Sequence, residues 1–410
     1  MYEENRIFAK KHMKQRLKIS VLNLALISVL LVLCACERNP PIPMGPTPFT
    51  IQIPPGFPTN LNIPSYNPMT YEGIRLGRYL FFEPRLSGRF DPNIPGSGMS
   101  CFTCHNPRYS FESGMDVLNE NRKVVGLTGV EAPTAMLPLI NLVFQHEGYT
   151  WSGMVHPSNT NLGLEIPEYG VSIPAQEPFH FRNLESFAWL MIALPHEIHG
   201  TIEASVNAIA NIPMYPPLFE AAFGTPEVTI ERIGKAIAQF VRTLISADSQ
   251  FDRFRLGKEM LCDSAFAGWL MFESERADCF HCHGGFGNPL FTTGGFANNA
   301  LEDENFVHRH DRYSFTGNPQ DRGRYRIPTL RNIALTAPYM HDGRFATLEE
   351  VVDFYSDSLK WSPTVDPNMK FVHQGGVQLT DRERRQLILF LQTLTDTSFI
   401  TNPAFQNPFR

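Results

Sequence analysis

The chain carries the pentapeptide Cys-x-x-Cys-His twice. The two copies are Cys101-Phe-Thr-Cys104-His105 and Cys279-Phe-His-Cys282-His283. This pentapeptide is the attachment signature of c-type haem. Two thiols at this spacing lie one helical turn apart, so both reach one edge of a porphyrin, and the adjacent His supplies the proximal iron ligand. The sequence therefore predicts two covalently bound haems.

A lone Cys-x-x-Cys also occurs in zinc sites and in thioredoxin-like redox pairs. Neither alternative explains the His that follows each pair. The two copies lie too far apart for a zinc ribbon, and neither belongs to a βαβ pattern. We therefore favour haem attachment over zinc binding or dithiol chemistry.

The three remaining cysteines do not form a disulfide framework. Cys34 and Cys36 lie at the end of an N-terminal apolar run, which leaves Cys262 alone. We expect Cys262 to be a small buried apolar residue.

The N-terminus has the pattern of a secretion signal. Residues 10–18 are basic and residues 19–33 are nearly all apolar. This apolar stretch is shorter than the ~20 residues of a membrane-spanning helix, so it favours a signal peptide over residues 1–35.

The apolar run ends in Leu33-Cys34-Ala35-Cys36, which resembles a bacterial lipobox. The resemblance implies cleavage before Cys36, a lipid anchor on its thiol and a periplasmic protein held at a bacterial membrane. An ordinary signal peptide with incidental cysteines is the alternative. The net charge of −6 argues against nucleic acid as a partner.

Residues 36–66 are rich in proline, and we expect an extended tether there. An arm packed on the first domain is the alternative, since Ile51 and Ile53 alternate with polar Gln52. A boundary near Gly224-Thr225-Pro226 would then give one haem motif to each of two domains, residues 67–225 and 226–410.

The elements that must position the motifs are mainly helices. Thr229 precedes an apolar stripe from Ile230 to Leu244 at helical spacing. Thr347 with Glu350 and Thr380 with Glu383 form capping boxes before two further stripes. No run of alternating strands is present. We expect a mainly α fold of two c-type cytochrome domains, each with one covalent haem, joined by long loops.

Two runs in the second half carry a family resemblance. They are Arg326-Ile327-Pro328-Thr329-Leu330-Arg331-Asn332 and Ala337-Pro338-Tyr339-Met340-His341-Asp342-Gly343. Together with the two haem motifs they resemble the bacterial dihaem cytochrome c peroxidase and MauG superfamily, and the details are most similar to its MauG- and MbnH-like branch. The resemblance implies that hydrogen peroxide is used at the N-terminal haem, while the C-terminal haem stores or relays oxidising equivalents.

The resemblance also implies roles at the first haem. The family's distal His falls at Asn121, and no His lies between Asn106 and Gln145, so we expect a five-coordinate first haem. Glu197 matches the family's distal acid and is the expected general acid/base. It is alternatively a loop residue without a catalytic role. The family's distal Gln and Pro fall at Phe187 and Met191, which predicts a more apolar pocket.

Three further positions follow from the same resemblance. Tyr355 falls where the family has the second axial ligand of the C-terminal haem, and Trp151 falls between the haems. Each is alternatively a core residue. Thr336 and Pro338 match positions whose carbonyls bind a structural calcium ion, although the third protein ligand has no clear counterpart and could fall at Glu131 or Ala135.

Three functions are compatible with this sequence. The first is a peroxide-driven enzyme that oxidises an aromatic residue of a partner protein, which Tyr355 and the missing distal His favour. The second is a cytochrome c peroxidase that removes hydrogen peroxide with electrons from a small cytochrome, and a Met in place of Tyr355 would favour it. The third is a dihaem electron carrier without enzymatic activity.

Overall fold

The computed structural model describes residues 45–94, 96–154, 164–166, 171–173, 183–194, 197–198 and 201–409. Residues 45–410 form one compact unit. The expected signal peptide and Cys36 therefore lie outside the described residues. Within the described ranges, none of the helices has the length and apolar character that a membrane span requires.

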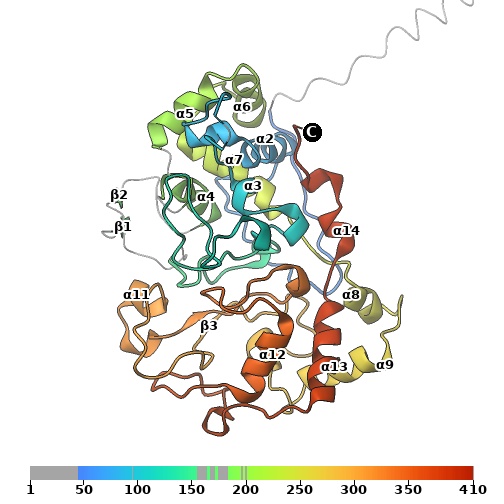
Figure 1. Cartoon of the computed structure of the whole chain (residues 1–410). Helices are drawn as coiled ribbons and strands as arrows, with labels where there is room; N and C mark the ends of the chain where they lie inside the picture. Colours follow the sequence, from blue (N-terminus) through green and yellow to red (C-terminus); the bar gives the residue numbers. More distant parts are fainter. Residues whose placement is uncertain are drawn as a thin grey trace, which may run out of the picture. The chain divides into compact units, whose positions relative to one another are not determined.

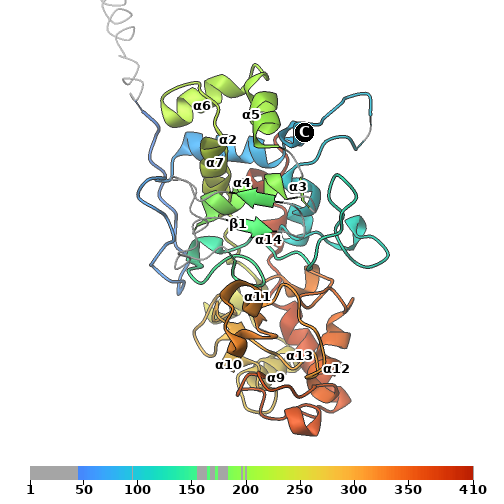
Figure 2. The same cartoon turned by 90° about the vertical axis from the view of Figure 1, so that its left-hand side faces the viewer.

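The fold is mainly helical, as predicted (Figures 1 and 2). The helices are α2 (Tyr71–Phe81), α3 (Cys101–Cys104), α4 (Leu184–Ala193), α5 (Ile202–Ala210), α6 (Tyr215–Phe223), α7 (Ile230–Arg242), α8 (Gln250–Arg255), α9 (Asp263–Phe272), α10 (Phe280–His283), α11 (Arg312–Thr316), α12 (Leu348–Asp357), α13 (Asp381–Gln392) and α14 (Thr397–Ile400). The strands form two short antiparallel pairs, β1 (Leu164–Ile166) with β2 (Val171–Ile173) and β3 (Phe296–Ala297) with β4 (Tyr325–Arg326).

Short 3-10 helices interrupt the loops between these elements. They are η1 (Pro84–Ser87), η2 (Pro107–Tyr109), η3 (Met115–Val117), η4 (Leu142–Phe144), η6 (Pro319–Asp321), η7 (Ile333–Leu335), η8 (Val372–Gln374) and η9 (Pro403–Phe405).

The three helices predicted from capping residues are confirmed. The Thr229 side chain accepts from the backbone of Arg232 at the start of α7. Thr347 and Thr380 each complete a capping box, at the starts of α12 and α13. A side-chain oxygen at the N-cap satisfies a backbone N–H that the helix leaves free, so the local sequence determines these starting points.

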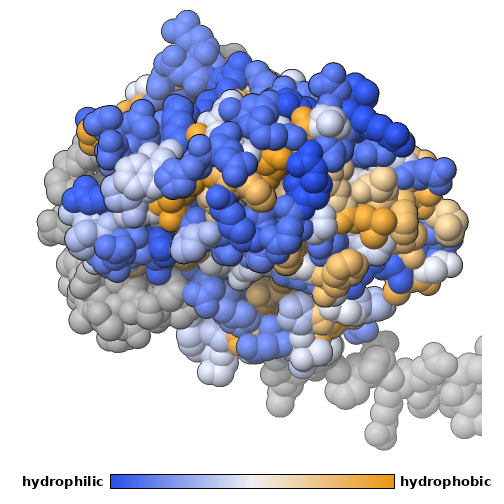
Figure 3. All heavy atoms as spheres, turned by 90° about the horizontal axis from the view of Figure 1, so that it is seen from below, coloured by the Kyte–Doolittle hydropathy of each residue, from blue (hydrophilic) through white to orange (hydrophobic). Residues whose placement is uncertain are grey.

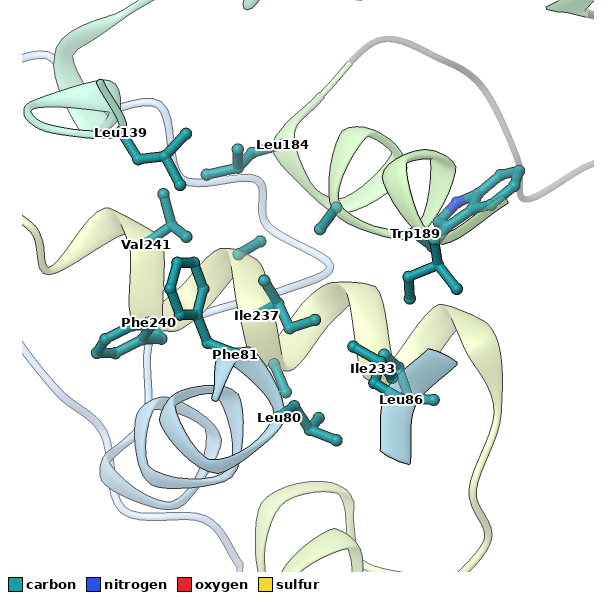
Figure 4. Packing of buried hydrophobic residues seen from close by; sticks show 14 of the residues in the cluster. Leu80, Phe81, Leu86, Leu139, Leu184, Trp189, Ile233, Ile237, Phe240 and Val241 are labelled. Carbon is teal, nitrogen blue, oxygen red and sulfur yellow. The ribbon is translucent and has the colours of Figure 1, made fainter. Parts of the chain in front are cut away.

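The first hydrophobic cluster is built where α2 crosses α7. Leu80 and Phe81 of α2 lie against Ile237 of α7 (Figure 4). The backbones approach closely because α2 has Gly77 at the crossing, where a Cβ would lie 1.9 Å from the carbonyl oxygen of Ala236. The crossing therefore requires glycine.

The second cluster repeats this crossing with α9 and α13. A Cβ on Gly268 of α9 would lie 2.0 Å from the carbonyl oxygen of Gln386 and 3.0 Å from the Cβ of Phe390. At Gly77 the matching neighbour is the Cβ of Phe240, also at 3.0 Å. In each half, one helix of the pair precedes the Cys-x-x-Cys-His motif and the other follows it.

The packing divides the chain differently from the expected boundary at residues 225 and 226. The whole of α7 belongs to the first cluster, and so do Phe399 and Phe405 near the C-terminus. Their ring centroids lie 5.9 and 6.5 Å from that of Phe111. Residues 230–244 and the C-terminal end, which the sequence assigned to the second domain, therefore pack with the first haem motif.

Residues 45–66, the described part of the expected tether, pack on the body. Ile51 and Phe57 are buried in a cluster with Val143 and Phe144. The backbone N–H of Phe49 donates to the carbonyl of Met69 over 2.9 Å. This segment is therefore the packed arm considered as the alternative, because its apolar side chains bury against the first domain.

A buried polar network ties the end of the run 326–332 to distant segments. The side-chain amide of Asn332 donates to Ser110 Oγ (2.8 Å) and to Ser246 Oγ (3.1 Å). The backbone N–H of Asp396 donates to Asn332 Oδ1 over 2.7 Å. Buried polar groups stabilise a structure when they are bonded in this way. The network fixes the loops beside the two haem motifs relative to one another.

Candidate functional site

The first haem motif presents two thiols and one neutral imidazole. α3 begins at Cys101, and both Cys101 and Cys104 are free thiols. His105 Nδ1 lies 2.7 Å from the carbonyl oxygen of Phe111. Because a carbonyl only accepts, this bond holds the proton on Nδ1 and leaves Nε2 unprotonated. Burial lowers the pKa of His105 to about 4, so the ring is neutral at neutral pH.

The second motif repeats this arrangement. Cys279 and Cys282 are free thiols at α10, and His283 Nδ1 lies 3.2 Å from the carbonyl oxygen of Phe291. Burial lowers the pKa of His283 to about 4. Histidines that bind metals use the same arrangement, in which a carbonyl holds one ring nitrogen and thereby orients the other.

Each imidazole borders a cavity. The first cavity has a volume of about 880 Å³ and is lined by His105. The second has a volume of about 220 Å³ and is lined by Cys279, Cys282 and His283. Thiols in pairs, each pair followed by a neutral nitrogen ligand beside a cavity, are the donor set that a c-type haem needs. The residues present therefore fit one haem at each motif.

Glu197 lines the first cavity together with His105. It follows α4 in a turn, where its backbone N–H donates to the carbonyl of Leu194 over 3.0 Å. Burial raises the pKa of its carboxyl to about 8. The pKa of the Cys101 thiol is raised to about 12, mainly by burial and to a smaller extent by the nearby carboxyl of Glu197. The structure thus brings the predicted acid to the first haem motif, where it can hold a proton near neutral pH.

Apolar side chains form part of the wall beside Glu197. Phe187 and Met191, which replace the family's Gln and Pro, both line the first cavity. The ring of Tyr149 stacks on Phe187 at a centroid distance of 6.0 Å. A polar group beside such a wall is desolvated, which is consistent with the raised pKa of Glu197.

Asn121, at the position of the family's distal His, is exposed. Its side-chain amide donates to Glu131 Oε1 over 2.9 Å, and it is not part of the cavity wall. Two histidines from a distant loop, His308 and His310, do line the first cavity. Neither was predicted from the sequence, because they reach the cavity from a loop far along the chain and no local pattern links them to the first motif.

Trp151 lines both cavities. Its indole N–H donates to the carbonyl of Ala135 over 2.8 Å, and its ring lies edge-on to His341 at 6.5 Å. Its own carbonyl accepts from Arg326, which also lines both cavities. The side chain is half-buried and borders both cavities, and its position between two haems stays a prediction.

Tyr355 lies on α12 and lines the second cavity with His283. Its hydroxyl oxygen accepts from the side-chain amide of Asn299 over 3.0 Å. Burial raises the pKa of its phenol. Leu348 and Val352 of the same helix also line this cavity, so the predicted apolar stripe forms cavity wall and not only packed core.

The predicted calcium position has less support. Thr336 and Pro338 line the second cavity, but Glu131, one candidate for the third ligand, instead accepts from Asn119 over 2.6 Å. In the part of the chain that the structure describes, the one close group of acidic and His side chains lies elsewhere. That group is Glu275, Asp278 and His281, and the ammonium of Lys370 contacts all three. Calcium therefore stays a prediction.

Cys262 differs from the expectation. Its side chain is exposed at the N-cap of α9 and its thiol is free. It is therefore not a buried apolar residue.

Comparisons with known proteins agree with this site. Residues 71–260 match the family described as di-haem cytochrome c peroxidase. Methylamine utilization protein MauG of Methylorubrum extorquens is 30% identical over 84% of this chain and 85% of its own length. Cytochrome c551 peroxidase of Nitrosomonas europaea is 31% identical over 71% of this chain and 75% of its own length. A crystal structure of a MauG-like protein associated with microbial copper homeostasis is similar with a TM-score of 0.71 and 29% identity, covering 88% of this chain and 100% of that chain.

Proposed function

Because the chain belongs to the dihaem cytochrome c peroxidase family and is a haem peroxidase-type oxidoreductase, we propose that it uses hydrogen peroxide to oxidise an aromatic residue of a partner protein. In this proposal Cys101, Cys104, Cys279 and Cys282 hold the two haems of the family covalently. The bound haems supply the iron that breaks the peroxide O–O bond and holds the oxidising equivalents.

The side chain of Tyr355 is the single observation that carries the choice of a MauG-like function. A Met ligand raises the reduction potential of a haem and suits it to accepting electrons from a carrier, whereas an oxygen ligand stabilises oxidised iron. Tyr355 lines the second cavity with His283. The chain therefore has the ligand type that favours storing oxidising equivalents over rapid reduction by a cytochrome.

Glu197 performs the proton transfer in this proposal. Its carboxylate would accept a proton from one oxygen of hydrogen peroxide and donate it to the other oxygen, which leaves as water. The carboxyl lines the first cavity, and its pKa of about 8 lets it exchange a proton near neutral pH.

Trp151 provides the route between the two haem sites. An aromatic ring that lines both cavities shortens each step of charge transfer between them. The bond from its indole N–H to Ala135 fixes the orientation of the ring.

A surface patch on the second half suits the docking of a protein partner. Figure 3 shows hydrophobic side chains gathered at its right-hand edge, on the side where α8 and α9 lie in Figure 1. Exposed apolar residues lie on α9, at Phe266 and Leu270, and between α8 and α9, at Leu256 and Met260. Exposed apolar patches of this kind mark interaction surfaces.

Aromatic rings connect this patch with the second haem motif. Phe291, whose carbonyl holds His283, lies 5.6 Å from Phe251. Phe251 lies 5.6 Å from Trp269, and Trp269 lies 5.7 Å from exposed Phe286. Electrons removed from an aromatic residue of the partner would reach the second haem site along this row of rings.

We also propose a periplasmic location with a lipid anchor at Cys36. The basic and apolar residues 10–33 followed by Cys36 support it. Mass spectrometry of the mature N-terminus tests this proposal, since a diacylglyceryl-modified Cys36 supports it and an unmodified N-terminus at another residue contradicts it.

Optical and electron paramagnetic resonance spectra test the proposed function. They are recorded first on the resting ferric holoprotein, and again after one equivalent of hydrogen peroxide is added without an electron donor. We expect one high-spin five-coordinate haem, one low-spin haem with an oxygen ligand and a long-lived spectral change after peroxide. Two low-spin haems that react with peroxide only after half-reduction would instead indicate a peroxidase supplied by a small cytochrome. A lack of reaction in either redox state would leave an electron carrier.

A further inference from the structure

Several side chains that could supply a second axial ligand line the second cavity. Tyr355 and Met340 are two of them, on the same cavity as His283. A phenol oxygen and a thioether sulfur are both haem ligands, and they give different reduction potentials. The chain therefore needs a feature that determines which of the two atoms binds iron.

One amide group bonds to both candidate atoms. Asn299 Nδ2 donates to the hydroxyl oxygen of Tyr355 over 3.0 Å and to the sulfur of Met340 over 3.6 Å. An oxygen is a good acceptor, whereas a thioether sulfur is a weak one. When the oxygen carries negative charge as an iron ligand, its bond from the amide becomes charge-assisted and therefore stronger.

The backbone on both sides of Asn299 is held firmly. Asn298 donates from its side chain to Ser362 Oγ over 3.0 Å and accepts from the N–H of Ala300 over 3.0 Å. The carbonyl of Ala300 accepts from Lys360 over 2.8 Å. The amide of Asn299 is thus presented to the cavity from a fixed loop after β3.

Met340 is also held in an unusual backbone conformation. Its φ of 72° lies in the left-handed region, which a residue with a side chain rarely adopts. The N–H of Gly343 donates to the Met340 carbonyl over 3.2 Å and closes the turn. Such strain is maintained only where the surrounding structure fixes it, so the position of Met340 is determined by its neighbours.

We propose that Asn299 is a positioning residue that selects the oxygen of Tyr355, and not the sulfur of Met340, as the second axial ligand of the haem at His283. This inference rests on the proposed function, because it requires a haem at the second motif. Asn299 donates one N–H to the oxygen that would bind iron and directs the other toward the sulfur of Met340. The sulfur is thereby kept off the iron. This selection of the ligand transfers no electron and breaks no covalent bond.

Substitution of Asn299 by Leu removes the donor and keeps the branched shape of the side chain. In the Asn299→Leu holoprotein we expect the near-infrared and electron paramagnetic resonance signals of oxygen ligation to be lost and thioether signals to appear. The midpoint potential of the second haem should become more positive, because a Met ligand raises the reduction potential of a haem. The double variant Asn299→Leu/Met340→Leu should lose the thioether signals again. Met369→Leu is the matched control, since Met369 lines the same cavity and should change none of these signals.

Unchanged oxygen-ligand signals and an unchanged potential in Asn299→Leu would overturn the inference and leave the proposed function intact. Thioether ligation in the unsubstituted protein would overturn both. If Asn299→Leu fails to incorporate haem, Asn299→Asp keeps the shape while replacing the N–H donors with an acceptor oxygen. The same loss of oxygen ligation is expected for it, and retained ligation would count against the role of the donor.

Discussion

His105 and His283 share a detail that determines how they can bind metal. The Nδ1 atom of each lies within hydrogen-bond distance of a phenylalanine carbonyl, at 2.7 Å and 3.2 Å. The carbonyl selects the tautomer in which Nε2 has a free lone pair, and burial keeps the ring neutral. Both imidazoles are therefore preorganised as ligands before any haem is attached.

Glu197→Gln is expected to slow the reaction with hydrogen peroxide by about 10²- to 10⁴-fold, the usual contribution of general acid–base catalysis. The carboxyl must be deprotonated to accept a proton from peroxide. Because burial raises its pKa to about 8, the rate constant of the unsubstituted protein should rise as the pH increases through about 8. Stopped-flow measurements at pH values on both sides of 8 test this, and the variant should lack the rise.

Glu112→Gln is the matched control for this experiment. Burial also raises the pKa of Glu112, to about 7, but its carboxylate accepts from Ser113 and Gly114 and does not line the first cavity. Its variant should keep the rate constant and its pH profile. A Glu197→Gln protein that reacts at the original rate would exclude Glu197 as the acid/base.

Tyr355→Met is expected to convert the second haem to thioether ligation. The reduction potential should rise, and the protein should gain turnover with a reduced small cytochrome while losing oxidation of a partner's aromatic residue. Potentiometric titration and steady-state assays with both types of substrate measure these changes. The proposal would be contradicted if the variant oxidised the partner as fast as the parent protein.

At the residue scale, local spacing predicted the two haem motifs, and the family resemblance supplied Glu197, Trp151 and Tyr355. The structure brings these three to the cavity walls, while their roles stay predictions. His308 and His310 were missed because they reach the first cavity from a loop far along the chain. Contacts of such long range are set by tertiary packing and leave no local pattern.

Among the elements, the paired crossings α2 with α7 and α9 with α13 depend on glycines that let the two backbones approach closely. Gly268→Ala places a methyl group 2.0 Å from the Gln386 carbonyl, so the helices must separate. We expect the free energy of unfolding to fall by about 1–3 kcal/mol, the usual effect of overpacking. Thermal denaturation of the holoprotein, followed by circular dichroism, measures the loss.

Gly295→Ala provides the comparison for the Gly268 variant. A Cβ at Gly295 meets only Thr293 Oγ1 at 3.7 Å, which is an ordinary contact. This substitution should change the stability by no more than about 0.5 kcal/mol. Equal losses in the two variants would mean that the helix crossing is not the cause.

The sequence predicted helices better than it predicted their partners. The N-caps Thr229, Thr347 and Thr380 act within one turn, so their effect is visible in the local sequence. The arm over residues 45–66 and the placement of α7 in the first cluster depend on which apolar faces meet. Proline content and a Gly-Thr-Pro turn do not contain that information.

For the molecule as a whole, Trp151 is the expected connection between the two haem sites. Trp151→Phe keeps an aromatic ring but removes the bond to Ala135 and shortens the ring system. We expect both haems to be retained and the redistribution of charge between them after peroxide to become slower. Stopped-flow spectra that resolve the bands of the two haems measure this rate.

Trp361→Phe is a suitable control because Trp361 is 44% exposed and stacks on His373 away from the first cavity. It should leave the rate unchanged. If Trp151→Phe also left the rate unchanged, charge would pass between the haems by a route that avoids Trp151.

The contacts of Phe399 and Phe405 have a consequence for the order of folding. In a chain of several domains the N-terminal one usually folds first. Phe399 and Phe405, however, follow the second haem motif in the sequence and pack on Phe111, whose carbonyl orients His105. The core around the first motif therefore closes only after the segment that carries the second motif has been made. A chain truncated before Phe399 is expected to contain both motifs and yet lack an ordered first site.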